Sequence, residues 1–163
     1  MSEVLSEKHV YKSTHVESNT RIRFFILVSM QKEKKKVEVV AAIIKHNDKV
    51  LCVQRGENKL EYISKKYEFP GGKIEEGETN EETIIREIQE ELHMNIRTEE
   101  KFITVEYEYP DFFLTMHSFI CSCDDPTVQL TEHIDFKWLS TSELEELDWA
   151  GADVPIVKEL IQA

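Results

Sequence analysis

The sequence predicts an α/β fold in which strands outnumber helices. Two patterns indicate this: short apolar runs bounded by turn-forming residues, which are typical of strands, and one long segment with apolar residues at helical spacing. The chain has 163 residues, the length expected of one domain, and its apolar content of 40% is enough for a hydrophobic core.

Residues 1–29 are mostly polar, lack a clear pattern and contain neither glycine nor proline. We expect them to form a weakly ordered N-terminal extension, and we place the folded domain over residues 30–163, with Met30 just before its first strand. The apolar run over residues 24–28 is much shorter than the roughly 18 residues that a membrane-spanning helix requires.

The first two strands are predicted from the apolar pattern of residues 37–54. Val37–Lys45 is a nearly continuous apolar run, which predicts a strand buried on both faces. His46–Lys49 has the composition of a turn, and Val50–Gln54 returns as the second strand. Residues 56–66 are polar and are predicted to form a loop.

Three further strands are predicted in the second half of the chain. Phe102–Tyr109 and Phe112–Cys123 flank Pro110-Asp111, a pair that suits the turn of a hairpin. Phe136–Leu139 is a short apolar strand.

Two helices are predicted after these strands. Ser140 and Glu143 have the spacing of a capping box at the start of a short helix that ends at Leu147. The closing helix covers Val154–Ile161, with Asp153 as its N-cap and a proline in its first turn.

The strongest helix signal lies between the two groups of strands. Thr79 is a good N-cap, and Glu82 completes a capping box three residues later. Ile84, Ile88 and Leu92 recur every four residues and form one apolar stripe.

Three glutamates share a second face of this helix: Glu87, Glu90 and Glu91. Like charges at this spacing destabilise a helix by roughly 0.2–0.5 kcal/mol per pair. A hard cation would relieve the repulsion, and Mg²⁺ is the usual cation beside phosphates. Taken alone, the three glutamates are more typical of a solvated acidic face on a surface helix.

The segment before the helix favours a phosphate site. Gly71 and Gly72 follow a proline, and paired glycines allow the backbone to approach a ligand closely or to adopt a positive φ. Lys73 follows them and supplies a point charge suited to a phosphate oxygen. A glycine pair after proline would otherwise be only a turn.

Together these residues resemble the Nudix box, G-x5-E-x7-R-E-U-x-E-E-x-G-U, where U is a bulky apolar residue. The positions that match it are Gly72, Glu78, Arg86, Glu87, Ile88, Glu90, Glu91 and Met94. One position departs from it, because His93 replaces the glycine that would end the helix in a left-handed conformation. Histidine tolerates a positive φ better than most residues, so we expect a small loss of stability there.

The resemblance implies the Nudix fold, a mixed β-sheet sandwiched between α-helices. Within the family, the chain is most similar to MutT-like nucleoside triphosphate pyrophosphohydrolases, from about Val37 to Leu160. The supporting segments outside the box are Val39–Ile44, Tyr67–Lys73, Thr131–His133 ahead of Trp138, and Gly151–Pro155.

The resemblance also implies a metal site. Its candidate ligands for Mg²⁺, with Mn²⁺ as an alternative, are the Gly71 carbonyl and the carboxylates of Glu87, Glu90, Glu91 and Glu132.

The implied catalytic roles involve the neighbouring charges. Glu87 is the candidate general base or a metal ligand, and Arg86 would orient Glu87 or Glu78 by a charge-assisted bond. A simple ion pair between Arg86 and a glutamate four residues on is the alternative. Lys73 and Arg55 are candidates for neutralising phosphate charge, and Gly72 would let the substrate approach the backbone.

Asp153 is the candidate contact to the base. An ionised carboxylate only accepts hydrogen bonds, so it would take N1–H and N2–H₂ of guanine or 8-oxo-guanine together. Cytosine would fit only a protonated Asp153, although relatives that prefer cytidine nucleotides often carry Asp there. The remaining interpretation is that Asp153 merely caps the last helix. Tyr109, Phe112 and Phe113 could stack on a base, but are more typical of core.

The expected function is therefore Mg²⁺-dependent hydrolysis of 8-oxo-dGTP or similar non-standard nucleoside triphosphates to a monophosphate and pyrophosphate, which would sanitise the nucleotide pool. Hydrolysis of CTP, dCTP or 5-methyl-dCTP is the alternative substrate class. A catalytically silent nucleotide-binding module is a further alternative, which the complete set of glutamates disfavours.

Charge and cysteine content limit the partners and compartment. A net charge of −12 argues against nucleic-acid polymers and anionic membranes, both of which need a basic surface. The three cysteines, Cys52, Cys121 and Cys123, lack paired zinc-site spacing, which suggests reduced thiols in a cytoplasmic protein. Monomer and homodimer remain equally open.

Overall fold

The computed structural model describes residues 34–163, so the predicted extension over residues 1–29 and the boundary at Met30 lie outside the described residues. The described chain forms one mixed six-stranded sheet. Five strands lie in the order β3 (Tyr67–Glu68), β2 (Lys49–Gln54), β1 (Lys35–His46), β5 (Phe112–Ser122) and β4 (Arg97–Glu108), and β6 (Asp135–Leu139) pairs with β2.

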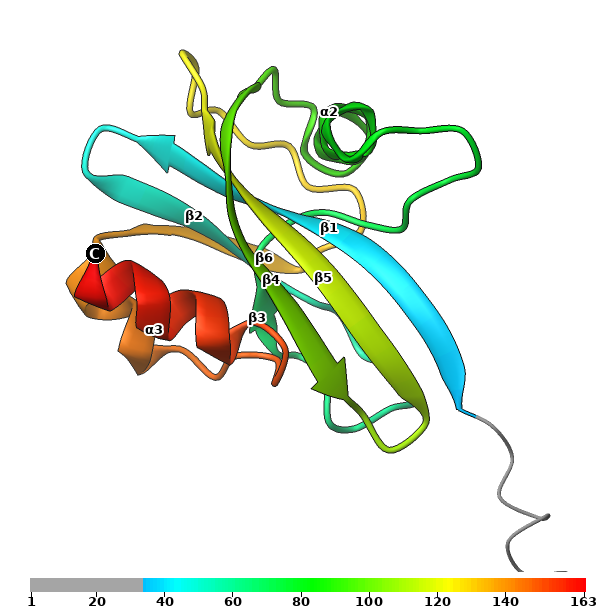
Figure 1. Ribbon diagram of the computed structural model, residues 1–163. Coiled ribbons are helices and arrows are strands. Elements are labelled where there is room, and N and C mark those ends of the chain that lie inside the picture. The colour runs from blue at the N-terminus through cyan, green and yellow to red at the C-terminus, as the bar shows by residue number, and fades with distance from the viewer. Residues whose placement is uncertain (1–33) are drawn as a thin grey trace, which may run out of the picture. The chain divides into compact units, whose positions relative to one another are not determined.

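Helices cover the two faces of the sheet. Helix α2 (Asn80–Leu92) packs on one face (Figure 1). Helix α3 (Val154–Gln162) and the 3-10 helix η1 (Thr141–Glu146) pack on the other. The predicted arrangement of a mixed sheet between helices is confirmed.

The centre of the sheet joins segments that are far apart in the sequence. Strands β1 and β5 run parallel, with Lys35 opposite Phe112 and Lys45 opposite Ser122. The other pairs are antiparallel, and β4 and β5 form the predicted hairpin. The Tyr109 N–H donates to the Phe112 carbonyl at 2.9 Å to close its turn.

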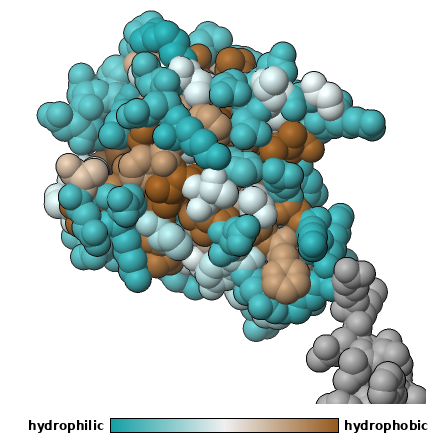
Figure 2. Space-filling model, in the orientation of Figure 1, coloured by the Kyte–Doolittle hydropathy of each residue, from teal (hydrophilic) through white to brown (hydrophobic). Residues whose placement is uncertain are grey.

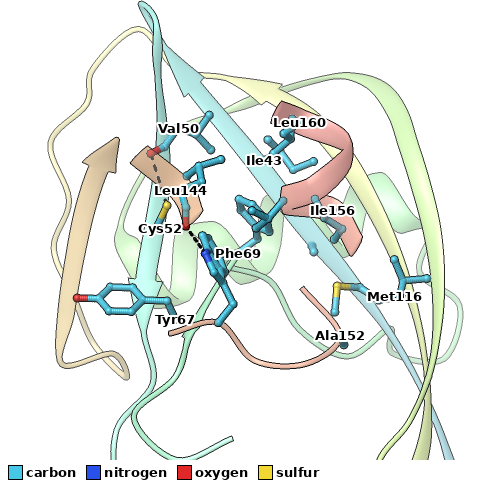
Figure 3. Packing of buried hydrophobic residues seen from close by; sticks show 14 of the residues in the cluster. Ile43, Val50, Cys52, Tyr67, Phe69, Met116, Leu144, Ala152, Ile156 and Leu160 are labelled. Atoms are coloured by element: carbon cyan, nitrogen blue, oxygen red, sulfur yellow. Dashed lines mark hydrogen bonds between the residues drawn. The ribbon is translucent and has the colours of Figure 1, made fainter. Parts of the chain in front are cut away.

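Strand β1 is buried on both faces, which explains its continuous apolar run. Ala41 and Ile43 face the core that includes α3, whereas Ala42 and Ile44 face the core that includes α2. Figure 3 shows Ile43 with side chains from β2, β5, η1 and α3 in the first of these cores.

Three elements differ from the sequence prediction. Strand β4 begins at Arg97 rather than Phe102, because its polar first residues pair with the end of β5 through two register shifts. The short strand β3 was not predicted, since its two residues form a strand only by pairing with β2. The helix after Ser140 is a 3-10 helix that begins at Thr141, although Glu143 accepts from the Ser140 N–H as a capping box requires.

Both ends of α2 match the prediction. The Glu82 N–H donates to the Thr79 hydroxyl at 3.2 Å, and the Thr79 N–H donates to the Glu82 carboxylate at 2.9 Å. His93 adopts the left-handed conformation with a φ of 53°, which is the conformation that a glycine usually provides. The chain thus tolerates histidine where the Nudix box has glycine.

Asp153 stands at the N-cap position of α3, but its side chain does not cap the helix. Its Oδ1 instead accepts a hydrogen bond from the Phe69 N–H at 2.9 Å, and the residue is only 3% exposed. The interpretation of Asp153 as merely a helix cap is therefore wrong. The proline of the first turn is found where it was predicted.

The cysteines of the described chain are free and buried, and Cys121 and Cys123 pack in the core beside α2, as their apolar run predicts. None of the helices in residues 34–163 is long and apolar enough to cross a membrane. Hydrophilic residues cover most of the face seen in Figure 2, with apolar residues visible between them.

We predict that Thr79→Ala lowers the free energy of unfolding by about 1 kcal/mol, because it removes the oxygen that accepts the Glu82 N–H. Urea denaturation followed by circular dichroism measures this change. Glu81→Gln in the same turn leaves the capping box intact and serves as the control. Equal effects of the two substitutions would show that the cap does not stabilise α2.

Candidate functional site

A cavity of about 470 Å³ opens beside β1, between the glycine pair and the β4–β5 hairpin. The charged residues of its lining, called the charged end below, include Arg55, Glu68, Lys73, Glu87, Glu91 and Glu132. The apolar residues of its lining include Ile63, Phe69, Tyr109, Phe112, Leu114 and Met116. The size and the mixed lining suit a ligand that has both a charged group and a flat apolar group.

The glycine pair runs along β1. The Val40 N–H donates to the Gly72 carbonyl at 2.9 Å, and the Ala42 N–H donates to the Pro70 carbonyl at 2.8 Å. The carbonyl of Gly71, between them, takes no part in this pairing. Both glycines are needed: a Cβ on Gly71, whose φ is 152°, would lie 2.2 Å from the Val40 oxygen.

Gly72 also brings a helix glutamate close to the backbone. A Cβ on Gly72 would lie 2.2 Å from the carboxyl carbon of Glu87. The absence of a side chain therefore lets the Glu87 carboxylate reach the cavity wall.

Arg86 connects the acidic residues of this region. Its Nε and Nη2 donate to the two oxygens of Glu78 at 2.6 and 2.8 Å, and its Nη1 donates to Glu87 at 2.9 Å. Nη2 also donates to the Lys73 carbonyl at 3.3 Å. The contact to Glu90 is the longest, at 3.4 Å. Arg86 thus orients both carboxylates that the sequence suggested and is more than a simple pair with Glu90.

The Arg86 guanidinium, with help from the Thr83 hydroxyl, lowers the pKa of the Glu78 carboxyl to about 2. The same hydrogen bond raises the pKa of Arg86 above its usual range. Glu78 is consequently a fixed anion that holds Arg86 in place, and it does not line the cavity.

In residues 34–163, the Glu91 carboxylate has no ion pair that would neutralise it. Burial, together with the charges of Glu87, Glu132 and Glu68, raises the pKa of its carboxyl to about 7, and His133 opposes this effect. Its Oε2 is buried and accepts no hydrogen bond. A buried carboxylate oxygen with no donor is costly unless a cation or a proton meets it.

Arg55 and His133 hold Glu68 between them. Arg55 donates to Glu68 Oε2 from Nε at 2.9 Å and from Nη2 at 2.8 Å. His133 Nε2 lies 3.0 Å from the other oxygen, Oε1. Glu68 raises the pKa of Arg55 above its usual range, although burial opposes this shift. Glu68 therefore fixes the guanidinium at the charged end of the cavity.

These residues fit a divalent cation. In the described part of the chain, no three acidic, histidine or cysteine side chains surround one point closely enough to ligate an ion. The unpaired Oε2 of Glu91 and the cavity-lining carboxylates of Glu87 and Glu132 nevertheless supply the hard oxygen donors that Mg²⁺ prefers.

The structure brings most of the predicted site residues to this one cavity. Those that line it are Arg55, Gly71, Gly72, Lys73, Glu87, Glu91 and Glu132. Arg86 and Glu78 stand directly behind Glu87. Glu90 does not line the cavity, and its side chain is 61% exposed.

Asp153 is also outside the cavity lining, although its neighbour Ala152 and its bonding partner Phe69 belong to it. Burial, with a further contribution from Glu68, raises the pKa of Asp153 well above its usual range. The expected contact to the base used an ionised Asp153, whereas burial disfavours the charged form of this carboxyl.

Sequence reasoning missed Glu68 and His133 as site residues and favoured core positions for two aromatic residues. Glu68 stands directly before the Phe69-Pro70-Gly71 segment, and His133 directly follows Glu132. Their positions next to predicted site residues could have indicated them from the sequence. Tyr109 belongs to the core and Phe112 packs against it, and both also line the cavity. The core position expected for Phe113 is wrong, because this side chain is 42% exposed.

Comparison with known proteins shows the family. The family model described as "NUDIX domain" matches residues 34–160. The chain is 31% identical over 127 residues to an 8-oxo-dGTP diphosphatase of Escherichia coli K12, covering 77% of this chain and 97% of that protein. It is also 31% identical over 124 residues to a CTP pyrophosphohydrolase of the same organism, covering 76% and 90%.

A solved structure gives the same result. The solution NMR structure of a MutT protein of the Nudix hydrolase family from methicillin-resistant Staphylococcus aureus 252 is 38% identical to this chain. The match has a TM-score of 0.62 and covers 79% of this chain and 98% of that one.

We predict that Glu91→Gln changes how stability depends on pH when metal is chelated. Because the folded-state pKa of Glu91 is about 7 against an ordinary 4.5, its contribution is full below pH 4.5 and is lost as the pH rises through 7. Glutamine does not undergo this loss.

The melting temperature of Glu91→Gln relative to the unmodified protein should therefore be higher at about pH 8 than at about pH 5. Thermal unfolding in EDTA measures the difference, with the exposed substitution Glu81→Gln as the control. The same difference at both pH values would contradict a buried, unpaired Glu91.

Proposed function

The chain belongs to the Nudix family, and on that basis we propose that it is a Mg²⁺-dependent nucleoside triphosphate pyrophosphohydrolase of the MutT type. Its substrate is 8-oxo-dGTP or a similar non-standard nucleoside triphosphate, and its products are the monophosphate and pyrophosphate. The observation that carries the proposal is the buried, unpaired oxygen of Glu91, which lines a cavity together with further charged residues and with apolar ones.

The charged and apolar residues of the cavity lining match the two parts of a nucleotide. Aromatic and aliphatic side chains such as Phe69, Tyr109 and Phe112 offer flat apolar surface to a base. Arg55 and Lys73 face the triphosphate and offset its charge. The nucleotide therefore lies along β1 with its phosphates toward α2.

Mg²⁺ would be held by the oxygens of Glu91 and Glu132, with Glu90 and the Gly71 carbonyl as further ligands, and Glu87 would stand beside it as the general base. Magnesium bound there would supply positive charge against the phosphate oxygens and the leaving pyrophosphate. Glu90 must turn inward to join the set, which its exposure and long contact to Arg86 allow.

Glu87 accepts a proton from the attacking water. Its Oε1 is fixed by Arg86, so Oε2 is the oxygen available for the proton. The water oxygen bonds to phosphorus as the bond to the bridging oxygen breaks, and the electron pair leaves with pyrophosphate. Arg86, held by Glu78, keeps Glu87 oriented throughout.

Asp153 selects the base as a neutral acid. A neutral carboxyl offers one donor and one acceptor, and it complements O6 and N7–H of 8-oxo-guanine. Unmodified guanine presents two acceptors at that edge and fits less well. Because Asp153 accepts from the Phe69 N–H outside the cavity lining, its contact to a base requires the turn at residues 151–153 to shift toward the cavity.

CTP, dCTP or 5-methyl-dCTP is the second candidate substrate class. The same neutral carboxyl can donate to N3 of cytosine and accept from N4–H₂. The CTP pyrophosphohydrolase relative is as similar to this chain as the first 8-oxo-dGTP diphosphatase relative, at 31% identity each.

A panel of nucleotides tests the proposal: 8-oxo-dGTP, dGTP, dCTP, 5-methyl-dCTP and CTP, each with Mg²⁺, followed by pyrophosphate release. We expect the fastest turnover with 8-oxo-dGTP, and Glu91→Gln should lower that turnover by orders of magnitude while the protein stays folded.

Selective turnover of the cytidine nucleotides would assign the second candidate. No turnover of any nucleotide would contradict the proposed activity and favour the catalytically silent binding module. Turnover by Glu91→Gln at the unmodified rate would remove Glu91 from the metal site.

A further inference from the structure

The loop that carries Glu132 is attached to the last turn of α2. The Gln129 N–H donates to the Leu92 carbonyl at 3.0 Å, and the Thr131 N–H donates to the Glu91 carbonyl at 3.0 Å. The Thr131 hydroxyl lies 3.1 Å from both the Glu90 and the Glu91 carbonyls. These bonds satisfy carbonyls that a helix end otherwise leaves unpaired.

The same loop is attached on the other side of Glu132 to β2 and β3. His133 Nε2 lies 3.0 Å from Glu68 Oε1, and the side chains are only 5% and 14% exposed. The Ile134 N–H donates to the Gln54 carbonyl at 2.9 Å. Since Arg55 occupies the other oxygen of Glu68, this carboxylate has a donor at each oxygen.

Glu132 therefore stands between two side-chain anchors, one to α2 and one to β3. Burying His133 costs free energy that burying an apolar residue would not, because its Nδ1 is buried without a hydrogen-bond partner. Despite this cost, His133 places a hydrogen-bond donor against Glu68 Oε1. A side chain that only filled space would not require a donor at this position.

We propose that Thr131 and His133 are positioning residues that hold the Glu132 carboxylate at the charged end of the cavity. Glu68 extends this arrangement by joining the Glu132 loop to Arg55. The inference rests on the proposed function for the role of Glu132 as a metal ligand. Groups behind a metal ligand commonly set metal affinity by fixing the geometry of that ligand.

Mn²⁺ binding to the metal-free protein tests the inference without relying on catalysis. The dissociation constant is measured by electron paramagnetic resonance of free Mn²⁺ for the unmodified protein, Glu132→Gln, His133→Ala and the double variant. We expect each single substitution to weaken binding about tenfold. The double variant should bind no more weakly than Glu132→Gln alone, because His133 acts through Glu132.

Two further variants separate positioning from general packing. Thr131→Val keeps the shape of the side chain and removes the hydroxyl, so it should weaken Mn²⁺ binding only when Glu132 is present. His117→Ala is the matched control: it removes another histidine–glutamate contact, from His117 Nε2 to Glu38 at 2.8 Å, at residues that do not line the cavity. It should leave the Mn²⁺ dissociation constant unchanged.

His133→Gln guards against misfolding, because its amide nitrogen can stand near the position of Nε2 and donate to Glu68, whereas His133→Asn cannot reach. We expect Gln to retain tighter Mn²⁺ binding than Asn at similar melting temperatures. The inference would be overturned if Thr131→Val and the His133 variants left the Mn²⁺ dissociation constant unchanged. It would also be overturned if these substitutions weakened Mn²⁺ binding equally in the presence and in the absence of Glu132. Missing hydrolysis by the unmodified protein would instead count against the proposed function.

Discussion

The hydrogen bonds of Arg86 are the interaction on which the acidic side of the cavity depends. One guanidinium contacts Glu78 through two bonds, Glu87 through a third and the Lys73 backbone through a fourth. These side chains are 15–24% exposed, so solvent screens the contacts only partly. Without Arg86, the glutamates of α2 would repel one another and the glycine segment would lose a contact to the helix.

Arg86 neutralises only part of the negative charge of the glutamates, and the charge that remains allows the site to bind a cation. The guanidinium is committed to Glu78 and Glu87, while Arg55 is committed to Glu68. Glu91 is left with a buried oxygen that meets no donor. The fold thus leaves a negative charge in the cavity without a compensating positive charge. A proton or a divalent cation must neutralise it.

Local patterns predicted the bounds and caps of α2 well. The Thr79 capping box, the left-handed His93 and the two-sided burial of β1 depend on residues close in sequence or on simple periodicity. Long-range pairing was harder to predict, since the polar start of β4 is a strand only because β5 lies beside it. The raised pKa of Asp153 was missed for a related reason: burial by distant segments, not local sequence, causes it.

Since the pKa of Glu91 is about 7, a cation that binds its carboxylate should displace a proton. Calorimetric titration of Mg²⁺ at about pH 6.5, in two buffers with different ionisation enthalpies, measures the protons released on binding. The account predicts release of roughly 0.5–1 proton per protein, which Glu91→Gln should abolish. Identical heats in both buffers, and hence no proton release, would contradict it.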